Sequence, residues 1–249
     1  MKEKRIYLIL GASSDLGIRL IGELNKEKEN CLFLLHYHSN ADNLHKIQML
    51  NGNKAEYFKA DFSKDNEVVR LISNIQQFCE APSYIVHFTS PAFAYKKLKQ
   101  FDIDRFDENV HIQAYSLIRI LQAFLPQMAK RREHNKIVLV LSSVTIGKPP
   151  KFMMEYVMVK YLLLGVLKSL ASDYEGRKIN INAVSPSMIH TKMLRNIDER
   201  MIALNAEKSA ENRNADVQDI VPVIRFLLSD EAEYLHGVNI NVSNGNVIG

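Results

Sequence analysis

The sequence repeatedly places a short, uninterrupted run of apolar residues ahead of a segment whose apolar residues recur at helical spacing. Such runs occupy positions 6–10, 31–35 and 137–141, and largely apolar runs that contain His87, Asn180 and Asn182 occupy positions 84–88 and 179–184. A strand covered by helices on both faces is apolar at every position, whereas a strand with one wet face alternates. Strands that alternate with helices form parallel sheets joined by right-handed crossovers. The chain is therefore predicted to be an α/β protein with a doubly wound parallel sheet flanked by helices.

The remaining pattern gives the order of the elements and no sign of a second domain. Further strands are expected at 55–59 and 238–242, with helices around 41–50, 66–78, 106–128, 155–174 and 217–228. No linker-like or repeated segment divides them, so we expect one domain over residues 1–249. Residues 188–214 are long for a loop in a compact domain, and such loops are commonly functional. We expect this stretch to be a substrate lid, and its Met193, Leu194, Met201 and Arg195 suggest a partly apolar substrate.

The composition is that of an ordinary globular protein and narrows the classes of partner. Hydrophobic residues make up 47% and charged residues 24% of the chain, and the formal net charge is +4. The basic clusters are short, so no nucleic-acid partner is expected. The apolar runs are too short for a signal peptide or a membrane span, so we expect a cytoplasmic protein without a membrane partner. The two cysteines are too few for a disulfide framework and lack metal-ligand spacing, so no metal site is expected.

A glycine turn follows the first apolar run and precedes a helical pattern. It reads Gly11-Ala-Ser-Ser-Asp15-Leu-Gly17. Glycine permits a tight turn and close approach of a ligand, and the N-terminus of the following helix offers free N–H groups to a pyrophosphate. The dinucleotide fingerprint has three glycines. Only the outer two are present here, with Asp15 in the middle place, so the turn alone is a weak to moderate sign of dinucleotide binding.

The residues after the second apolar run bear on the choice between NAD and NADP. An acidic residue at this place bonds the adenosine ribose hydroxyls of NAD. The segment His36-Tyr-His-Ser39-Asn40 has none before Asp42. His36, Ser39 and Asn40 could instead accommodate the 2′-phosphate of NADP, or they could be ordinary polar residues at a strand end. We rank the cofactor interpretation slightly ahead and expect NADP(H) to be favoured over NAD(H), although the glycine turn lacks a lysine or arginine.

Tyr156 and Lys160 are spaced so that their side chains meet on one face of a helix. A nearby ammonium favours the phenolate and lowers the pKa of a tyrosine below its ordinary value of about 10. The pair is therefore a candidate acid–base device for a carbonyl or alcohol oxygen. Ser143 follows the apolar run at 137–141 and could bond the same oxygen. Many amphipathic helices contain this spacing by chance, so a tyrosine packed on a lysine stem is the competing interpretation.

Four further segments complete a pattern that resembles the short-chain dehydrogenase/reductase family over nearly the whole chain, and in particular its 3-oxoacyl-carrier-protein reductase-like ketoreductases. They are Asp61-Phe62, Asn109-Val110, Ser185-Pro-Ser-Met-Ile-His-Thr191 and the helix before Asp230. The resemblance implies a single-domain Rossmann-type fold. It implies that the catalytic residues are Asn109, Ser143, Tyr156 and Lys160. It also implies that a dinucleotide contacts Gly11, Ser13, Ser14, Leu16, Gly17, His36, Ser39, Asp61, Phe62, Thr89, Tyr156, Lys160, Pro186, Ile189 and Thr191.

The resemblance further implies a reaction, namely hydride transfer between nicotinamide and a small-molecule carbonyl or secondary alcohol. Tyr156 would be the general acid or base, and Lys160 would lower its pKa and bond the nicotinamide ribose. Ser143 would orient the substrate oxygen, and Asn109 would hold a water in a proton relay. The spacing of Tyr156 and Lys160 points to carbonyl reduction and away from the enoyl reductases.

Some positions depart from the family pattern. Its Asn-Asn-Ala-Gly segment is His87-Phe-Thr-Ser90 here, the glycine after Pro186 is a serine, and its final Val-Asp-Gly-Gly is Val242-Ser-Asn-Gly. Together with Asp15, these changes motivate an alternative, a catalytically silent dinucleotide-binding sensor or scaffold. The apolar stripe from Tyr161 to Leu170 covers more than one helix face, so we also expect a homodimer or homotetramer.

Overall fold

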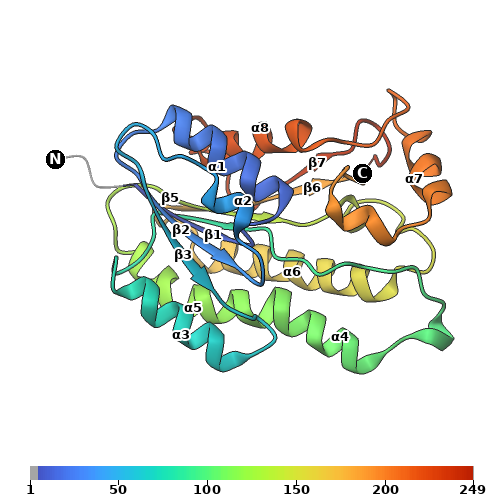
Figure 1. The fold of residues 1–249 in the computed structure, drawn as a ribbon, viewed down its shortest axis with the longest axis horizontal. Coiled ribbons are helices and arrows are strands. Elements are labelled where there is room, and N and C mark those ends of the chain that lie inside the picture. The colour runs from blue at the N-terminus through green and yellow to red at the C-terminus, as the bar shows by residue number, and fades with distance from the viewer. Residues whose placement is uncertain (1–4, 249) are drawn as a thin grey trace.

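The computed structural model describes residues 5–248, and a seven-stranded sheet runs through them (Figure 1). The strand order is β3-β2-β1-β4-β5-β6-β7, and every pairing is parallel. The strands are β1 (Ile6–Leu10), β2 (Leu32–Tyr37), β3 (Lys54–Lys59), β4 (Tyr84–His87), β5 (Asn135–Val140), β6 (Ile179–Pro186) and β7 (Asn239–Val242). The chain winds outward from β1 to β3 and then restarts at β4 on the other side of β1. Ligands of such sheets bind outside the carboxyl ends of the strands, at the place where the order reverses.

Helices cover both faces of the sheet (Figure 1). One face carries α3 (Asp65–Gln76), α4 (Ile103–Val110), α5 (Ser116–Met128) and α6 (Met154–Asp173). The other face carries α1 (Asp15–Glu27), α2 (Asp42–His45) and α8 (Val217–Leu228). The short helix α7 (Glu199–Ala206) and the 3-10 turn η4 (Lys192–Asn196) lie beyond the carboxyl ends of the strands.

Alternate side chains of each strand enter two separate cores. In β1, Leu8 and Leu10 pack in the cluster that includes residues of α3, α5 and α6. Tyr7 and Ile9 of the same strand pack in the cluster that includes residues of α1 and α8. Because both faces are covered, each position of the strand has to be apolar. The uninterrupted apolar runs are thus explained, and the predicted α/β doubly wound sheet is confirmed.

Three expected elements differ from the structure. The helix expected at 41–50 shortens to α2, because the side chain of Asn25 bonds the backbone at Gln48 and Leu50 and holds that segment outside a helix. The helix expected at 106–128 begins earlier, at Ile103, and it contains a π-helical turn, η2 (His111–Tyr115). The stretch at 188–214 is not a plain loop, since it contains η4 and α7.

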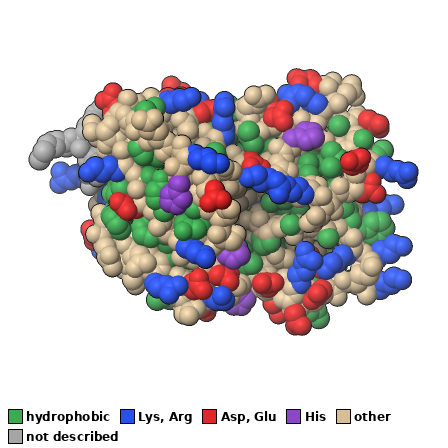
Figure 2. All heavy atoms as spheres, viewed as in Figure 1, with side chains coloured by type: hydrophobic (Ala, Val, Ile, Leu, Met, Phe, Trp, Pro, Cys, Tyr) green, Lys and Arg blue, Asp and Glu red, His purple; other side chains and the backbone are tan. Residues whose placement is uncertain are grey.

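Charged side chains of both signs are interspersed over the face shown in Figure 2. That face therefore presents no block of one sign. Among residues 5–248, no helix is long and apolar enough to cross a membrane. The same residues contain no group of three or more histidine, cysteine, aspartate or glutamate side chains that could hold a metal ion.

Candidate active site

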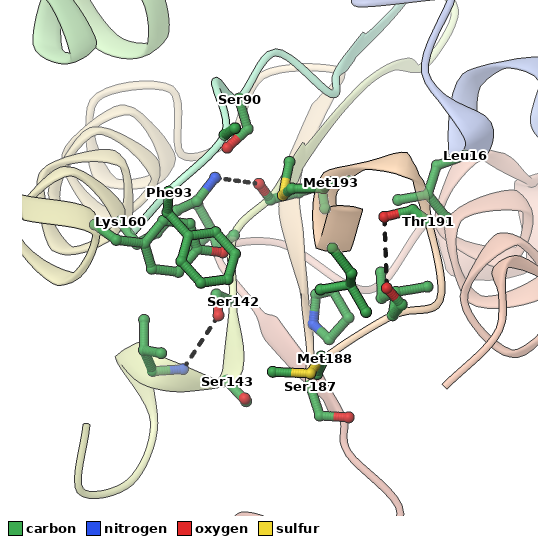
Figure 3. A pocket seen from close by; sticks show the side chains of 18 of the residues that line it. Leu16, Ser90, Phe93, Ser142, Ser143, Lys160, Ser187, Met188, Thr191 and Met193 are labelled. Carbon is green, nitrogen blue, oxygen red and sulfur yellow. Dashed lines mark hydrogen bonds between the residues drawn. The ribbon is translucent and has the colours of Figure 1, made fainter. Parts of the chain in front are cut away.

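A cavity of about 390 Å³ lies at the carboxyl ends of the strands. Its walls come from the glycine turn after β1, the segments that follow β4, β5 and β6, the first turns of α6, and the segment that leads through η4. Figure 3 shows Phe93, Lys160 and Ser142 along one side, with Met188, Met193 and Thr191 across from them. The cavity thus brings the predicted acid–base pair and the predicted dinucleotide turn together.

Tyr156 lies in the first turn of α6 and lines the cavity, and Ser142 lines the same cavity. The ring of Phe93 packs on the tyrosine with 4.9 Å between ring centroids. Burial raises the pKa of Tyr156, and the side chain of Ser142 only partly opposes this. The expectation of a pKa lowered by Lys160 is wrong for this structure, because the ammonium lies over the ring, 5.5 Å from its centroid. The phenol therefore carries its proton at neutral pH.

Lys160 follows one helical turn later, and its side chain is buried. Its Nζ donates to Gln113 Oε1 at 3.1 Å and to the backbone oxygen of Val140 at 3.4 Å. Neither partner is charged, so the cost of burying the ammonium is not offset, and burial lowers the pKa of Lys160 to about 8. The lysine is thus held by neutral acceptors behind Tyr156.

Gln113 reaches Lys160 because the π turn η2 interrupts the long helix at this point. A π turn adds a residue to one turn of the helix and re-aims the side chains that follow, and such turns are frequent at functional sites. Gln113 is 3% exposed. The family resemblance implied Asn109 for this place. The structure corrects that prediction: Asn109 lies earlier, in α4, and the side chain that faces Lys160 is Gln113.

Two serines follow β5, and the structure distinguishes their positions. Ser142 caps the 3-10 turn η3 (Ser143–Thr145), and its Oγ accepts from the backbone N of Val144 at 3.4 Å. Ser143, the predicted residue, also lines the cavity, and Ser142 is the serine whose side chain acts to lower the pKa of Tyr156. Both serines thus lie in the cavity wall just after the end of β5.

The outer glycines of the turn are required by close packing. Gly11 has a φ of +76°, and a Cβ there would lie 3.1 Å from the backbone N of Thr89. A Cβ on Gly17 would lie 2.5 Å from the oxygen of Ala12. Ser14 caps α1, since its Oγ accepts from the backbone N of Gly17 at 3.1 Å. The turn therefore presents residues 13–16 to the cavity in a fixed conformation.

His36 does not have the role that the sequence suggested. It is 2% exposed, its Nδ1 accepts from the backbone N of Gly11 at 3.1 Å, and its Nε2 donates to the oxygen of Ala60 at 3.0 Å. Its ring stacks on Phe62 at 3.9 Å between centroids. Burial lowers the pKa of His36 to about 4, so the ring is neutral. A neutral, buried imidazole with both nitrogens engaged cannot bind a 2′-phosphate; it supports the glycine turn instead.

The other predicted cofactor residues fall into two groups. Ser13, Ser14, Leu16, Pro186, Ile189 and Thr191 line the cavity. Ser39 and Asp61 lie outside it, beyond β2 and β3: Ser39 is exposed, and Asp61 pairs with Lys64 at 3.1 Å.

The residues present fit a dinucleotide. Among the described residues, Thr89 Oγ1 and Ser90 Oγ are buried without a hydrogen-bond partner, directly after β4 and beside the glycine turn. A buried hydroxyl without a partner costs about 1–3 kcal/mol, so groups of this kind point to a ligand or water. The glycine turn and the N-terminus of α1 supply the close backbone approach and the N–H groups that a pyrophosphate needs.

Comparisons with known proteins agree with this geometry. A model of short-chain dehydrogenase/reductase proteins, described as Enoyl-(Acyl carrier protein) reductase, matches residues 22–246. The chain belongs to the short-chain dehydrogenase/reductase family. This oxidoreductase is 26% identical over 241 residues to the 3-oxoacyl-[acyl-carrier-protein] reductase FabG of Pseudomonas aeruginosa, covering 97% of the chain and 96% of the relative. It is also 26% identical over 242 residues to the uncharacterized oxidoreductase YmfI of Bacillus subtilis, covering 96% and 97%.

Solved structures show the same fold. A short-chain dehydrogenase/reductase from Serratia marcescens superposes on the oxidoreductase with a TM-score of 0.86 at 19% identity, covering 98% of both chains. A short-chain type dehydrogenase/reductase from Mycobacterium ulcerans gives a TM-score of 0.85 at 20% identity, covering 97% of this chain and 89% of the other.

Proposed function

We propose that this oxidoreductase is a carbonyl reductase that uses NADPH in preference to NADH. The observation that carries the proposal is the convergence of Tyr156, Ser142 and Lys160 in a cavity whose opposite wall includes the glycine turn. The matching family model is described as an enoyl reductase, but the four-residue spacing of Tyr156 and Lys160 favours carbonyl reduction. The name of the Pseudomonas aeruginosa relative supports the same reaction type.

The chain's own groups divide the work at the substrate oxygen. When bound, the nicotinamide supplies or accepts the hydride. Tyr156 carries a proton at neutral pH, because burial raises its pKa, and it donates this proton as charge develops on the carbonyl oxygen. The hydroxyl of Ser142 orients the oxygen through a second hydrogen bond. Gln113 fixes the ammonium of Lys160 in place over the tyrosine ring, from where it would bond the nicotinamide ribose.

The cofactor would be held by three parts of the cavity edge. Residues 13–16 would take the phosphates at the N-terminus of α1, Thr89 and Ser90 would supply hydroxyls, and the residues from Pro186 to Thr191 would bound the nicotinamide end. The segment 37–40 contains no acidic residue, and His38 and Ser39 are exposed there. With His36 engaged elsewhere, these two side chains are our proposed contacts for the 2′-phosphate.

The cavity walls support an apolar ketone as substrate. Phe93, Tyr95, Met153, Met188 and Met193 line it. Met188, Met193, Leu194 and Asn205 come from the stretch at 188–214, which supports the lid role that we propose for it. A 3-oxoacyl thioester is our first candidate, because it combines a ketone with an apolar chain and because the Pseudomonas aeruginosa relative is named for that class.

We also propose that the protein is a homodimer or homotetramer. Met158, Tyr161 and Leu162 of α6 are 39%, 44% and 40% exposed. Removing these apolar side chains from water would favour association through this helix.

The proposal is tested by measuring both cofactor binding and substrate reduction. NADPH and NADH are titrated separately, and NADPH consumption is then followed with a 3-oxoacyl thioester, a panel of simple ketones and an enoyl thioester. We expect NADPH to bind more tightly and a ketone substrate to be reduced, and Tyr156→Phe to abolish reduction while cofactor binding persists. Turnover of the enoyl thioester alone, or reduction that survives Tyr156→Phe, would overturn the proposal. Cofactor binding without turnover of any carbonyl would favour the silent sensor or scaffold.

A further inference from the structure

We infer that Asp15 and Lys192 form a latch that closes the lid over the glycine turn, and that the phosphates of a bound dinucleotide compete with it. Asp15 would then be a residue that sets cofactor affinity. The inference rests on the dinucleotide binding proposed above. Asp15 occupies the position of the middle glycine in the dinucleotide fingerprint, and the catalytic mechanism proposed above gives it no role.

The latch joins segments 177 positions apart in the sequence. The Oδ2 of Asp15 accepts from the backbone N of Lys192 at 2.8 Å, and the Nζ of Lys192 lies 3.7 Å from Oδ1. A hydrogen bond to a carboxylate is stronger than one between neutral groups. The side chains are 28% and 53% exposed, so water weakens the ion pair itself. The contact is thus firm enough to hold the lid and weak enough to be exchanged for another anion.

The lid segment that the latch holds is also anchored where it leaves the sheet, at residues 189 and 190. Ile189 forms a bridge with Ala215, and the backbone N of His190 donates to the oxygen of Ala215 at 2.8 Å. Beyond this anchor, the chain turns over the cavity at Thr191 and enters η4. Figure 3 shows Thr191 beside Leu16, so the lid meets the glycine turn at this point. Release of Asp15 would loosen the start of η4, while the buried Leu194 and the anchor at Ala215 stay in place.

Asp15 lies among groups that could bind the phosphates of a dinucleotide, and it engages those of Lys192. Asp15 is the first residue of α1, where the helix carries partial positive charge and offers N–H groups to anions. The backbone N–H and the ammonium of Lys192 are further anion donors on the facing side of the cavity. The Asp15 carboxylate already occupies the donors of Lys192, and its negative charge repels a phosphate that enters the cavity. Binding therefore requires Lys192 to exchange the carboxylate for the phosphate.

Variants at the two ends of the latch have opposite expected effects on affinity. Asp15→Asn keeps the shape and removes the charge, and Asp15→Gly restores the three-glycine fingerprint and removes the acceptor. Both should lower the Kd of NADPH by about 3- to 10-fold, the range of 1 kcal/mol-scale charge interactions near a protein surface. Lys192→Met leaves Asp15 unbalanced and should raise the Kd by a similar factor. Asp173→Asn and Lys26→Met make the same charge changes on exposed side chains outside the cavity and serve as matched controls.

The experiment measures the Kd of NADPH and, in the cofactor-free protein, hydrogen exchange of the peptide that covers residues 190–196. Melting temperatures confirm that each variant is folded. In the absence of cofactor, Asp15→Gly and Lys192→Met should both speed exchange in this peptide, and the controls should not. An unchanged Kd and unchanged exchange in Asp15→Gly would overturn the latch while wild-type binding leaves the proposed function standing. Failure of the wild type and of both Asp15 variants to bind NADPH or NADH would overturn both.

Discussion

Two buried histidines should make the protein lose stability in mild acid. Burial lowers the pKa of His36 to about 4 and of His87 to about 3, from an ordinary value of 6.5, and the ammonium of Lys160 adds to the effect on His87. Between pH 6.5 and these values the unfolded chain binds a proton at each histidine and the folded protein does not. Stability is therefore complete above pH 6.5 and falls as the pH drops.

The size of the loss follows from the shifts. pH 5 lies about 1.5 units below the pKa of a histidine in the unfolded chain. Protonation therefore stabilises the unfolded state by about 2 kcal/mol at each histidine and by about 4 kcal/mol for the pair. Since a loss of 1 kcal/mol lowers the melting temperature of a domain of this size by roughly 2–4 °C, a decrease of roughly 8–16 °C between pH 8 and pH 5 is expected.

Urea unfolding at pH 8, 6 and 5 measures this loss, and His87→Phe isolates one histidine. Phenylalanine keeps a ring in the core and removes both nitrogens, which have no hydrogen-bond partner among the described residues. Loss of such groups is close to neutral or stabilising at pH 8. The variant should recover about 2 kcal/mol of the acid loss. His38→Asn, at an exposed histidine, is the matched control and should lose as much as the wild type. An equal loss in His87→Phe and the wild type would refute the reasoning.

Three further predictions concern the site and the assembly. Gln113→Leu removes the side-chain acceptor that fixes the catalytic lysine and should lower kcat by tenfold or more on the scale of acid–base contributions, whereas Asn109→Leu should change kcat little. Ser142→Ala should lower kcat/KM for a ketone on the order of 10²-fold, and Ser143→Ala clearly less, in the same steady-state assay. Tyr161→Glu should reduce the mass measured by light scattering to that of a monomer; a monomeric wild type would contradict the proposed interface.

The fold could be predicted because the sequence of each strand or helix already shows which of its faces the fold buries. β1 and β5 are covered on both faces, so β1 is apolar at every position and β5 is apolar from Ile137 onward, as expected of a buried parallel strand. The helix α8 was expected at the residues where it occurs, 217–228. Tyr156 and Lys160 were also predicted as neighbours in the cavity, because four positions along a regular helix fix the relation of two side chains.

The residue that faces Lys160 could not be predicted by the same rule. The long helix contains a π turn at His111–Tyr115 that includes Gln113, and its sequence shows no signal for the turn. The match of Asn109-Val110 to the family pattern therefore predicts Asn109, although the side chain that contacts Lys160 is that of Gln113, one turn later. The error with His36 has a similar origin: β2 continues through Tyr37, so a histidine expected at an exposed strand end is inside the sheet.

Several unusual residues lie near the glycine turn, and two of them have hydrogen-bond partners far away in the sequence. Asp15 finds its partner in the lid, and His36 binds the glycine turn from below. His87 differs, because both its nitrogens are buried without a partner among the described residues, beside Lys160. A native protein keeps such groups where they have a function or hold a water. Burial, with a smaller contribution from the neighbouring ammonium, lowers the pKa of His87 and keeps this imidazole neutral at physiological pH, so it can hold a hydrogen bond near the lysine without adding a second positive charge behind Tyr156.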